Sequence, residues 1–425
     1  MTQDADVVVI GAGLAGLGAA TALRRRGRTA VVLEAAGRIG GRAWTAYPAA
    51  LGGVWFDMGA IWLHDAEHNP LTPIALAAGD TLLRSDTLRT ERTFIGARLA
   101  TEAELADYAN AWPRFEAAAE RLMQPGMPDV PLSAVARSLP DDPWAPTVES
   151  WEGPVICTVD AENYSLLDWK RNVLQGSNLV PDGGIGAFVQ RRLGEGLDVR
   201  LNTLVTRVHW DKSGGHVSVE TDQGTLTARS CIVTVSTGVL RAGNIAFDPA
   251  LPPRIQDALQ ALPMGLATKV ALRATGPDRL DLPPYCSVDR QVGRDGDLLV
   301  PVQCWPYGRD YVQGWIGGGT AWSLLREGDH AAVEYMHDTL RRAFGARADA
   351  LFADAPSLVT QWGNDPLTRG AYAYVTPGNA DARARLAEPL SDGHLLFAGE
   401  ACHIGYAGTL AGAWLSGEAA SEWVP

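Results

Sequence analysis

The sequence predicts an α/β fold of two domains, one with a parallel sheet and one with a mixed β-sheet and added helices. A continuous apolar run at 7–10 leads through glycines into a helical pattern, which is typical of a buried parallel strand followed by a helix. A second strand-and-helix pattern lies near the C-terminus, at 395–398 and 408–422. Short alternating strands occupy the middle of the chain. The length of 425 residues also exceeds the usual size of one domain.

The N-terminal and C-terminal strand-helix units are expected to form one domain, with the middle of the chain inserted between them. The predicted boundaries follow from this arrangement. The first domain comprises 1–75, 185–260 and 380–425, and the second domain comprises 76–184 and 261–379.

The remaining elements are predicted from periodicity and end signals. A helix over 14–26 ends at Gly27, a residue that favours the left-handed conformation after a helix, and a strand over 30–33 ends at Glu34. The stretch 80–137 is rich in alanine, glutamate and arginine and predicts helices. Strands are expected at 204–210, 216–221, 230–235 and 264–273, and a further helix at 330–344.

The composition is that of a folded, acidic protein. Hydrophobic residues make up 46% and charged residues 20% of the chain, and the net charge is −13. A negative surface repels phosphate backbones, so we expect no nucleic acid partner. No apolar run approaches the roughly 20 residues of a membrane helix, and no signal peptide precedes the first strand. We therefore expect no membrane segment and a cytoplasmic location.

The five cysteines are scattered along the chain without the spacing of a metal site. Such a distribution predicts a reducing compartment, no disulfide framework and no bound metal. The cysteines are Cys157, Cys231, Cys286, Cys304 and Cys402.

Gly11, Gly13 and Gly16 form a GxGxxG motif between the first strand and the first helix. Glycines at these positions allow a tight turn, a close approach of the backbone to a pyrophosphate, and close packing of helix on strand. Glu34 follows at roughly the 20-residue separation that lets a carboxylate accept hydrogen bonds from ribose hydroxyls and repel the 2′-phosphate of NADP. The alternative is a glycine-rich helix start with a surface glutamate. That alternative does not explain why the strand, the glycines, the helix, the second strand and the acid follow one another at the expected spacing. The motif predicts a Rossmann-like dinucleotide-binding domain.

Two arginines enclose a pair of glycines shortly after Glu34, in the segment 38–42. The glycines allow the backbone to approach a ligand, and the guanidinium groups of Arg38 and Arg42 suit phosphate, although a polar turn is the alternative. The pattern Glu-x-x-x-Arg-x-Gly-Gly-Arg resembles the FAD-binding signature of the flavin-containing amine oxidase superfamily. This resemblance favours FAD over NAD as the cofactor.

Further segments resemble the same superfamily and extend the resemblance over most of the chain, apart from about 80–150. The segment 57–64 resembles the loop beside the flavin, and 362–378 resembles the wall over it. The segments 236–252 and 264–270 are similar to polyamine oxidases and lysine-specific histone demethylases, and 397–417 resembles the C-terminal flavin motif.

The resemblance implies an FAD-dependent amine oxidase, closest to polyamine oxidases, whose second domain binds the substrate. Such an enzyme oxidises a C–N bond of a primary or secondary amine, polyamine-like or monoamine, and reduces molecular oxygen to hydrogen peroxide. Ala371 stands where mitochondrial-type monoamine oxidases have a cysteine bonded to the flavin, so FAD is expected to be held non-covalently. The expected partners are a small-molecule amine and oxygen, and no oligomeric state follows from the sequence.

The resemblance also implies which residues form the site. Catalytic roles are implied for Lys269, His64, Tyr372 and Trp362. Cofactor contacts are implied for Gly11, Gly13, Ala15, Gly16, Glu34, Ala35, Arg38, Gly40, Gly41, Arg42, Gly59, Ala60, Val205, Trp362, Gly399, Glu400, Gly408, Thr409 and Leu410. The expected substrate-binding residues are Trp62, His64, Asp160, Glu162, Tyr372 and Thr409, of which the two acids would hold a distal ammonium of a polyamine.

Lysine occurs only three times, as Lys170, Lys212 and Lys269, while arginine carries the remaining positive charge. Lys269 lies within the otherwise apolar strand pattern 266–272. In the resembling enzymes a lysine here hydrogen-bonds a water beside flavin N5 and assists the reaction with oxygen. A desolvated lysine also titrates nearer neutrality. The alternative is a solvent-facing strand lysine.

Three other functions remain open. An L-amino acid oxidase would need an arginine for the substrate carboxylate, and the segment 57–64 contains none. A flavin dehydrogenase or desaturase of the same superfamily would not use oxygen. A non-enzymatic binding module stabilised by FAD would leave its flavin oxidised with every amine. For His64, a role in orienting the amine or in proton transfer competes with a structural one.

Overall fold

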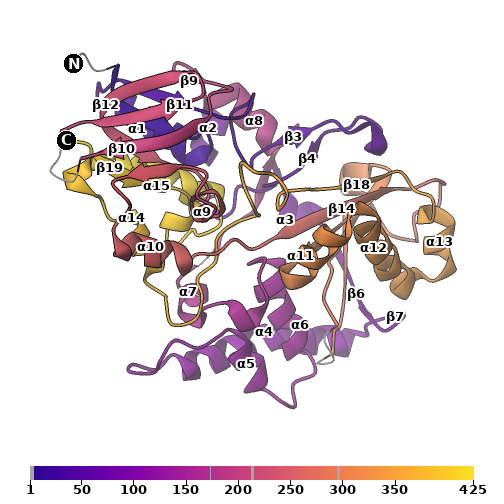
Figure 1. Ribbon diagram of the computed structural model, residues 1–425. Helices are drawn as coiled ribbons and strands as arrows, with labels where there is room; N and C mark the ends of the chain where they lie inside the picture. Colours follow the sequence, from indigo (N-terminus) through magenta and orange to yellow (C-terminus); the bar gives the residue numbers. More distant parts are fainter. Residues whose placement is uncertain (1–3, 173, 212–214, 294–296) are drawn as a thin grey trace.

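The computed structural model describes residues 4–172, 174–211, 215–293 and 297–425, and two large β-sheets organise it (Figure 1). The eight-stranded first sheet has the order β13-β10-β11-β12-β1-β2-β9, and β19 also pairs with β12. Its strands are β1(Ala5–Ile10), β2(Ala30–Leu33), β9(Asp198–Arg200), β10(Val205–Trp210), β11(Val217–Thr221), β12(Gly224–Val233), β13(Ala246–Asp248) and β19(Leu395–Phe397).

Parallel pairing joins the two ends of the chain within this sheet. The strand β1 pairs in parallel with β2 and β12, and β12 pairs in parallel with β19. The side chains of β1 are almost all buried, because Val7 and Val9 pack in a cluster with α1(Leu14–Arg25) and α15(Leu410–Glu422) while Val8 and Ile10 pack in a second cluster with strands β10 and β11, which explains the continuous apolar run. The helix α1 packs against α15, and Gly27 after α1 has a positive φ of 71°. Both termini lie at the same edge of the molecule in Figure 1.

The seven-stranded second sheet has the order β18-β14-β17-β16-β15-β6-β7. Its pairs are antiparallel except for β15 with β6, so the sheet is mixed as predicted. Its strands are β6(Thr90–Ile95), β7(Arg98–Leu99), β14(Ala267–Arg273), β15(Cys286–Arg290), β16(Val302–Cys304), β17(Tyr311–Gly317) and β18(Ser357–Val359). The helices α11(Gly318–Glu327), α12(Asp329–Phe344) and α13(Ala346–Phe352) lie beside it in Figure 1.

The remaining elements connect these sheets or form a helical layer below them in Figure 1. Two small sheets pair β3(Thr45–Ala46) with β4(Phe56–Asp57) and β5(Leu82–Arg84) with β8(Leu179–Pro181). The other helices are α2(Leu71–Ala77), α3(Ser85–Leu88), α4(Glu102–Leu122), α5(Ser133–Arg137), α6(Ala145–Ser150), the π-helix η2(Trp151–Val155), α7(Leu166–Arg171), α8(Ile185–Arg192), α9(Thr237–Arg241), α10(Pro253–Gln260) and α14(Ala382–Ala387). Within the described residues, none of the helices has the combined length and hydropathy that crossing a membrane requires.

The helical prediction for 80–137 is wrong at its start. Residues 90–95 form β6, which pairs with β15, while the helix α4 begins only at Glu102 behind a Thr101 capping box. The segment TERTFI carries β-branched and aromatic residues, and its backbone hydrogen bonds are satisfied by a strand almost 200 residues away in sequence. Tertiary pairing therefore outweighs the helical composition of the surrounding stretch. The predicted domain boundaries stay a prediction, and every strand of the two large sheets falls within the ranges given for its domain.

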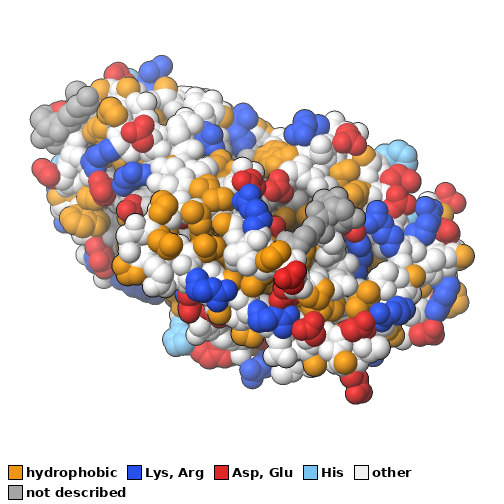
Figure 2. Space-filling view, turned by 90° about the horizontal axis from the view of Figure 1, so that it is seen from below, with side chains coloured by type: hydrophobic (Ala, Val, Ile, Leu, Met, Phe, Trp, Pro, Cys, Tyr) orange, Lys and Arg blue, Asp and Glu red, His pale blue; other side chains and the backbone are white. Residues whose placement is uncertain are grey.

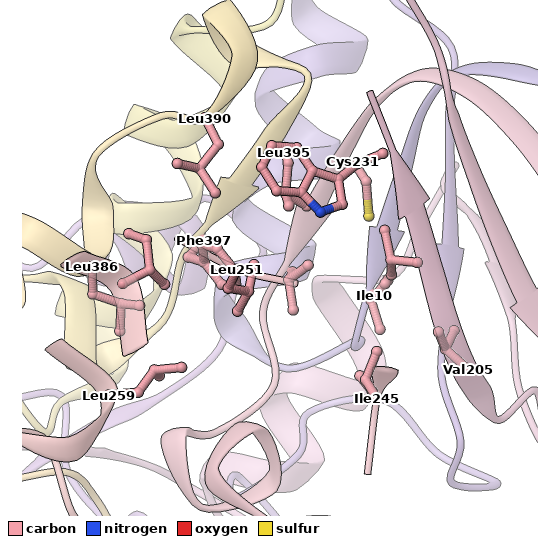
Figure 3. Packing of buried hydrophobic residues seen from close by; sticks show 14 of the residues in the cluster. Ile10, Val205, Cys231, Ile245, Leu251, Leu259, Leu386, Leu390, Leu395 and Phe397 are labelled. Atoms are coloured by element: carbon pink, nitrogen blue, oxygen red, sulfur yellow. The ribbon is translucent and has the colours of Figure 1, made fainter. Parts of the chain in front are cut away.

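Apolar side chains from distant segments meet on one face of the first sheet (Figure 3). Ile10 of β1, Val205 of β10 and Cys231 of β12 contribute from the sheet. Leu386 of α14 and Phe397 of β19 contribute from the C-terminal segment. On the outer surface, Figure 2 shows acidic and basic side chains interspersed over one face of the molecule.

A buried ion pair ties the helical layer to the C-terminal segment. Arg383 of α14 is 1% exposed and Asp168 of α7 is fully buried. Two parallel hydrogen bonds of 2.9 Å join the guanidinium group to the two carboxylate oxygens. Arg383 also donates to the carbonyls of Ala373 and Ala401. One guanidinium group thus satisfies acceptors on three separate segments of the chain.

Asp168→Asn is expected to lower the free energy of unfolding by about 3–5 kcal/mol, because it leaves the Arg383 guanidinium buried without its counter-charge. Urea denaturation measures the effect. Asp381→Asn is the matched control, since it breaks the exposed Arg171–Asp381 pair between the same two segments and should cost less than about 1 kcal/mol. Equal losses in the two variants would contradict the importance of the buried pair.

Candidate active site

A cavity of about 440 Å³ is lined by residues of both large sheets. Ile10, Leu33 and Val205 line it from the first sheet, while Lys269 and Trp315 line it from the second. The cavity lies at the carboxyl ends of β1 and β2, which is where ligands bind in sheets of this kind.

The GxGxxG turn forms one end of the cavity. Gly11 has a φ of 102°, which only glycine adopts without strain, and a Cβ on Gly16 would lie 1.9 Å from the Gly11 carbonyl oxygen. Gly16 therefore packs the helix onto the turn and does not line the cavity. A Cβ on Gly13 would meet no protein atom within 4 Å, because Gly13 faces the cavity. Only two of the three motif glycines face the predicted cofactor.

Glu34 is held at the end of β2 by the glycine turn. Its Oε2 accepts a hydrogen bond from the Ala12 amide at 2.7 Å, and its Oε1 accepts one from the Ala36 amide at 2.8 Å. Burial raises the pKa of this carboxyl, while the two amide hydrogen bonds lower it. The carboxylate thus lines the cavity in a fixed orientation with lone pairs left for a ligand.

The segment 38–42 lies against the glycine turn through a bridge between Gly13 and Gly40. The Arg38 guanidinium stacks 4.8 Å from the Trp44 ring, and Arg42 donates to Glu400 Oε1 at 2.9 Å and to the Ala371 carbonyl. Both arginines line the cavity and bring positive charge to it. Arg42 also holds the Glu400 carboxylate in place through its hydrogen bond.

Glu400 has one occupied and one open oxygen. Its Oε1 accepts hydrogen bonds from Arg42 and from the Ala373 amide, while Oε2 is buried and has no hydrogen-bond partner among the described residues. A buried carboxylate oxygen without a donor is costly. Because Glu400 lines the cavity, this oxygen fits a ligand that offers hydroxyl or N–H donors.

Lys269 of β14 points its ammonium group at the loop 57–59. The side chain is 5% exposed, and Nζ donates to the carbonyls of Asp57 at 2.6 Å and Gly59 at 2.5 Å. The ring faces of Phe56 and Trp315 lie 5.7 and 6.0 Å from Nζ. Burial lowers the pKa of Lys269 to about 7, and the Asp57 carboxylate opposes part of that shift. The alternative of a solvent-facing lysine is wrong, and a third N–H remains for a ligand in the cavity.

The other two lysines differ from Lys269. Lys170 pairs with Glu116 at the surface, at 2.8 Å. Lys212 lies outside the described residues.

His64 is oriented by a chain of hydrogen bonds. Asp86 accepts from the side-chain amide of Asn178 at 3.2 Å and from its backbone amide at 2.7 Å. This leaves the Asn178 Oδ1 as the acceptor for His64 Nδ1, at 2.6 Å. Nε2 is then the acceptor nitrogen of the imidazole ring, and burial lowers the pKa of His64, which favours the neutral form.

Aromatic side chains form the walls beside these groups. Trp362 donates its Nε1–H to the Met58 carbonyl at 2.9 Å, and Tyr372 donates its hydroxyl to the Ile156 carbonyl. A Cβ on Gly408 would lie 3.0 Å from the Tyr372 ring, so this ring lies flat against the glycine backbone. Trp62 stacks on Trp315 with 6.1 Å between ring centroids. These walls present aromatic faces, which attract cations, to the cavity.

Thr409 lines the cavity, but its hydroxyl is used locally. Its Oγ1 donates to the Tyr406 carbonyl and accepts from the Gly412 amide, so Thr409 caps α15. The positive end of the α15 dipole therefore faces the cavity.

Most of the residues predicted for the site line this one cavity. They are Gly11, Gly13, Ala15, Glu34, Ala35, Arg38, Gly40, Gly41, Arg42, Gly59, Ala60, Trp62, His64, Val205, Lys269, Trp362, Tyr372, Gly399, Glu400, Gly408, Thr409 and Leu410.

Asp160 and Glu162 are not among the residues that line the cavity, so its lining gives no support to their predicted role as substrate carboxylates, which stays a prediction. The carboxylate of Asp160 accepts from the Gly319 amide at the start of α11. Glu162 pairs at the surface with Arg137 at 2.7 Å. Both acids satisfy donors of the fold on segments distant in sequence, which a single sequence does not reveal.

Several polar or aromatic residues that line the cavity were not predicted from the sequence, among them Arg89, Asn172, Gln303 and Trp315. Trp315 stands directly opposite Lys269 in the pairing of β14 with β17. Nothing in the sequence distinguishes Trp315 from the other tryptophans, of which the chain has 14 in total. Only the register of the sheet places it beside Lys269. Among the residues that the structure describes, no group of three or more His, Cys, Asp or Glu side chains could hold a metal ion.

A nucleotide turn, an acid on the second strand and a buried lysine in one aromatic cavity are features of flavin-dependent oxidoreductases. The chain belongs to the family of flavin-containing amine oxidoreductases, whose sequence profile matches residues 14–127 and 136–424. The chain is therefore an amine oxidoreductase with a flavin cofactor.

Curated relatives extend over nearly the whole chain. Probable polyamine oxidase 4 of Arabidopsis thaliana is 30% identical over 98% of this chain and 86% of that protein. Polyamine oxidase 4 of Oryza sativa subsp. japonica is 29% identical over 98% of this chain and 88% of that protein. Lysine-specific histone demethylase 2 of Homo sapiens is 27% identical over 97% of this chain and 52% of that protein.

Among solved structures, wild-type putrescine oxidase bound to putrescine has the same fold. It matches with a TM-score of 0.79 over 98% of this chain and 98% of that chain, at 20% sequence identity. The open Oε2 of Glu400 and the space in front of Gly13 fit a flavin dinucleotide, which offers hydroxyl donors and a pyrophosphate.

Gly13→Ala is expected to reduce the flavin content of the purified protein at least about tenfold, because the new methyl group would project into the part of the cavity where the cofactor is expected to bind. The thermal stability of the flavin-free protein should stay within about 2 °C of wild type. Gly16→Ala is the contrasting variant, since its methyl group would meet the Gly11 backbone and should destabilise the flavin-free protein as well. Equal destabilisation of the flavin-free forms would show that Gly13 is structural.

Lys269→Met is expected to change how stability depends on pH. Above about pH 7 the folded protein has lost the Lys269 proton that the unfolded chain keeps, so unfolding takes up a proton and rising pH stabilises the fold. The free energy of unfolding of wild type relative to Lys269→Met should therefore rise towards about pH 10, by up to about 1.4 kcal/mol per pH unit. Urea denaturation across this range measures the slope. Lys170→Met, which removes an exposed lysine, should show no such slope.

Proposed function

We propose that this protein is an FAD-dependent oxidase of a primary or secondary amine, polyamine-like or monoamine, with molecular oxygen as the electron acceptor. The observation that carries the proposal is the ammonium group of Lys269, held inside the cavity by the carbonyls of Asp57 and Gly59. The polyamine oxidases among the relatives support an amine of this class.

Non-covalent FAD is part of the proposal. Glu34 would hold the ribose hydroxyls, and the glycine turn at Gly11 and Gly13 would cradle the pyrophosphate. The open Oε2 of Glu400 would accept from the hydroxyl-bearing chain of the flavin. Ala371 supports non-covalent binding because its methyl side chain offers no nucleophile to the cofactor.

Bound FAD would supply the two-electron acceptor for oxidation of the C–N bond and return those electrons to oxygen, giving hydrogen peroxide. The chain's own residues would prepare the amine for this step. Neutral His64, with Nε2 as its acceptor, would take the proton of the substrate ammonium. Trp362 and Tyr372 would guide the amine towards the flavin and exclude water. Lys269, which titrates near neutrality, would hold or deliver a proton where oxygen reacts.

A second candidate, an L-amino acid oxidase, gains one observation from the structure. Arg89 lines the cavity and could pair with a carboxylate, although one of its nitrogens already donates to Glu91 at 3.0 Å. The cytoplasm stays the proposed location, since five free thiols suit a reducing compartment.

Anaerobic mixing tests the proposed function directly. The flavin-loaded protein is mixed with 1,4-diaminobutane, spermidine, benzylamine and L-leucine, and the flavin absorbance is followed. At least one amine should bleach the flavin more than about tenfold faster than L-leucine does. Bleaching by L-leucine alone would favour the amino acid oxidase, and an unchanged spectrum with every compound would exclude both oxidases.

Re-admission of oxygen tests the acceptor. The reduced wild-type protein should reoxidise with stoichiometric hydrogen peroxide, and Lys269→Met should slow this step by about 100-fold, as expected when a positioned proton donor is lost. Lys170→Met is the control and should reoxidise as wild type. Unchanged reoxidation of Lys269→Met would remove the role given to Lys269.

A further inference from the structure

Asn172 lines the cavity and carries a buried acceptor without a hydrogen-bond partner among the described residues. Its Nδ2 donates to the carbonyl of Ala407 at 3.3 Å, which fixes which way the amide group is turned. The Oδ1 atom is buried and has no hydrogen-bond partner among the described residues. Asn172 lines the same cavity as Lys269 and Tyr372. A buried amide oxygen without a donor is unfavourable, so it marks a place where a ligand donor would be stabilised.

Hydrogen bonds to the preceding helix hold the backbone of Asn172. Asn172 follows α7, and its amide donates to the Asp168 carbonyl at 3.2 Å. Ser165 caps the start of α7, because its hydroxyl accepts a hydrogen bond from the Asp168 amide. The Asp168 carboxylate in turn pairs with Arg383. The Asn172 side chain is therefore placed by a fully buried ion pair one turn earlier. Such a supported position suits recognition of a ligand.

Asn172 also belongs to the neighbourhood of the aromatic wall. Its side-chain amide donates a hydrogen bond to the Ala407 carbonyl, and the adjacent Gly408 lies against the Tyr372 ring. An amine carries two or three N–H donors and has little use for further donors from the protein. Aromatic faces can attract its charge, but they do not fix the direction of an N–H bond. A carbonyl oxygen beside the wall supplies that direction.

We propose that Asn172 is a substrate-binding residue whose Oδ1 accepts a hydrogen bond from the amino group of the substrate beside Tyr372. The inference rests on the proposed oxidation of amines and names the residue that orients the amine. It separates the task of orientation at Asn172 from proton transfer at His64 and from the reaction with oxygen at Lys269.

Rapid mixing under anaerobic conditions tests the inference in the flavin-loaded protein. The probe is whichever of 1,4-diaminobutane, spermidine and benzylamine bleaches wild-type flavin fastest. Asn172→Ala should raise the apparent dissociation constant of this amine about tenfold, the effect of losing one hydrogen bond. Reoxidation by oxygen should stay as in wild type, because the variant leaves Lys269 untouched. A purely structural role would instead reduce flavin content or reoxidation.

Asn172→Asp keeps the shape and the acceptor, so it should bind the amine at least as tightly as wild type even if Asn172→Ala is unstable. Asn110→Ala is the matched control, since Asn110 also donates from its side-chain amide to a backbone carbonyl but lies on the exposed face of α4. Wild-type binding by Asn172→Ala, or weakened binding by Asn172→Asp, would overturn the inference. If no amine bleaches the wild-type flavin, it is the proposed function that fails.

Discussion

The buried guanidinium group of Arg383 is the constraint on which the site depends. It binds Asp168 on α7, the carbonyl of Ala373 in the aromatic wall, and the carbonyl of Ala401 beside Glu400. These three segments are far apart in sequence, and each carries a residue that lines the cavity. Because an unpaired buried charge is so unfavourable, an arrangement that separated Arg383 from these segments would be strongly destabilised. The placement of Asn172, Tyr372 and Glu400 follows from it.

The chemistry that the cavity supports follows from burial and not from an unusual set of residues. Removing water from Lys269 lowers the pKa of its ammonium group to about 7, which makes proton exchange possible near neutral pH. Burial acts in the same direction on His64, whose neutral form can accept a proton from an amine. Both groups are held by acceptors, two backbone carbonyls for Lys269 and Asn178 for His64. Two buried titratable nitrogens beside the cavity are suited to neutralising an amine before oxidation.

The residues that the sequence predicted to line one site do so where their requirements are local. The glycine turn, Glu34 and the arginines at 38–42 are close in the chain, and each has a backbone or charge requirement that few residues meet. The sequence did not predict contacts that are made across long separations. Residues 90–95 form a strand because β15 pairs with them, and the Asp160 carboxylate accepts a hydrogen bond from the Gly319 amide. The partnership of Asn178 with His64 likewise spans more than 100 residues.

By itself, the sequence determined the α/β class, the nucleotide turn, the likeness to flavin amine oxidases and the choice of Lys269 among three lysines. Each of these depends on residue type and short spacing. The tertiary structure decided that Lys269 is buried against the loop 57–59, that Asp160 and Glu162 accept hydrogen bonds from donors of the fold, and that Asn172 lines the cavity with a buried oxygen left unpaired among the described residues. The physical reason is that burial and hydrogen-bond satisfaction are set by which distant segments meet.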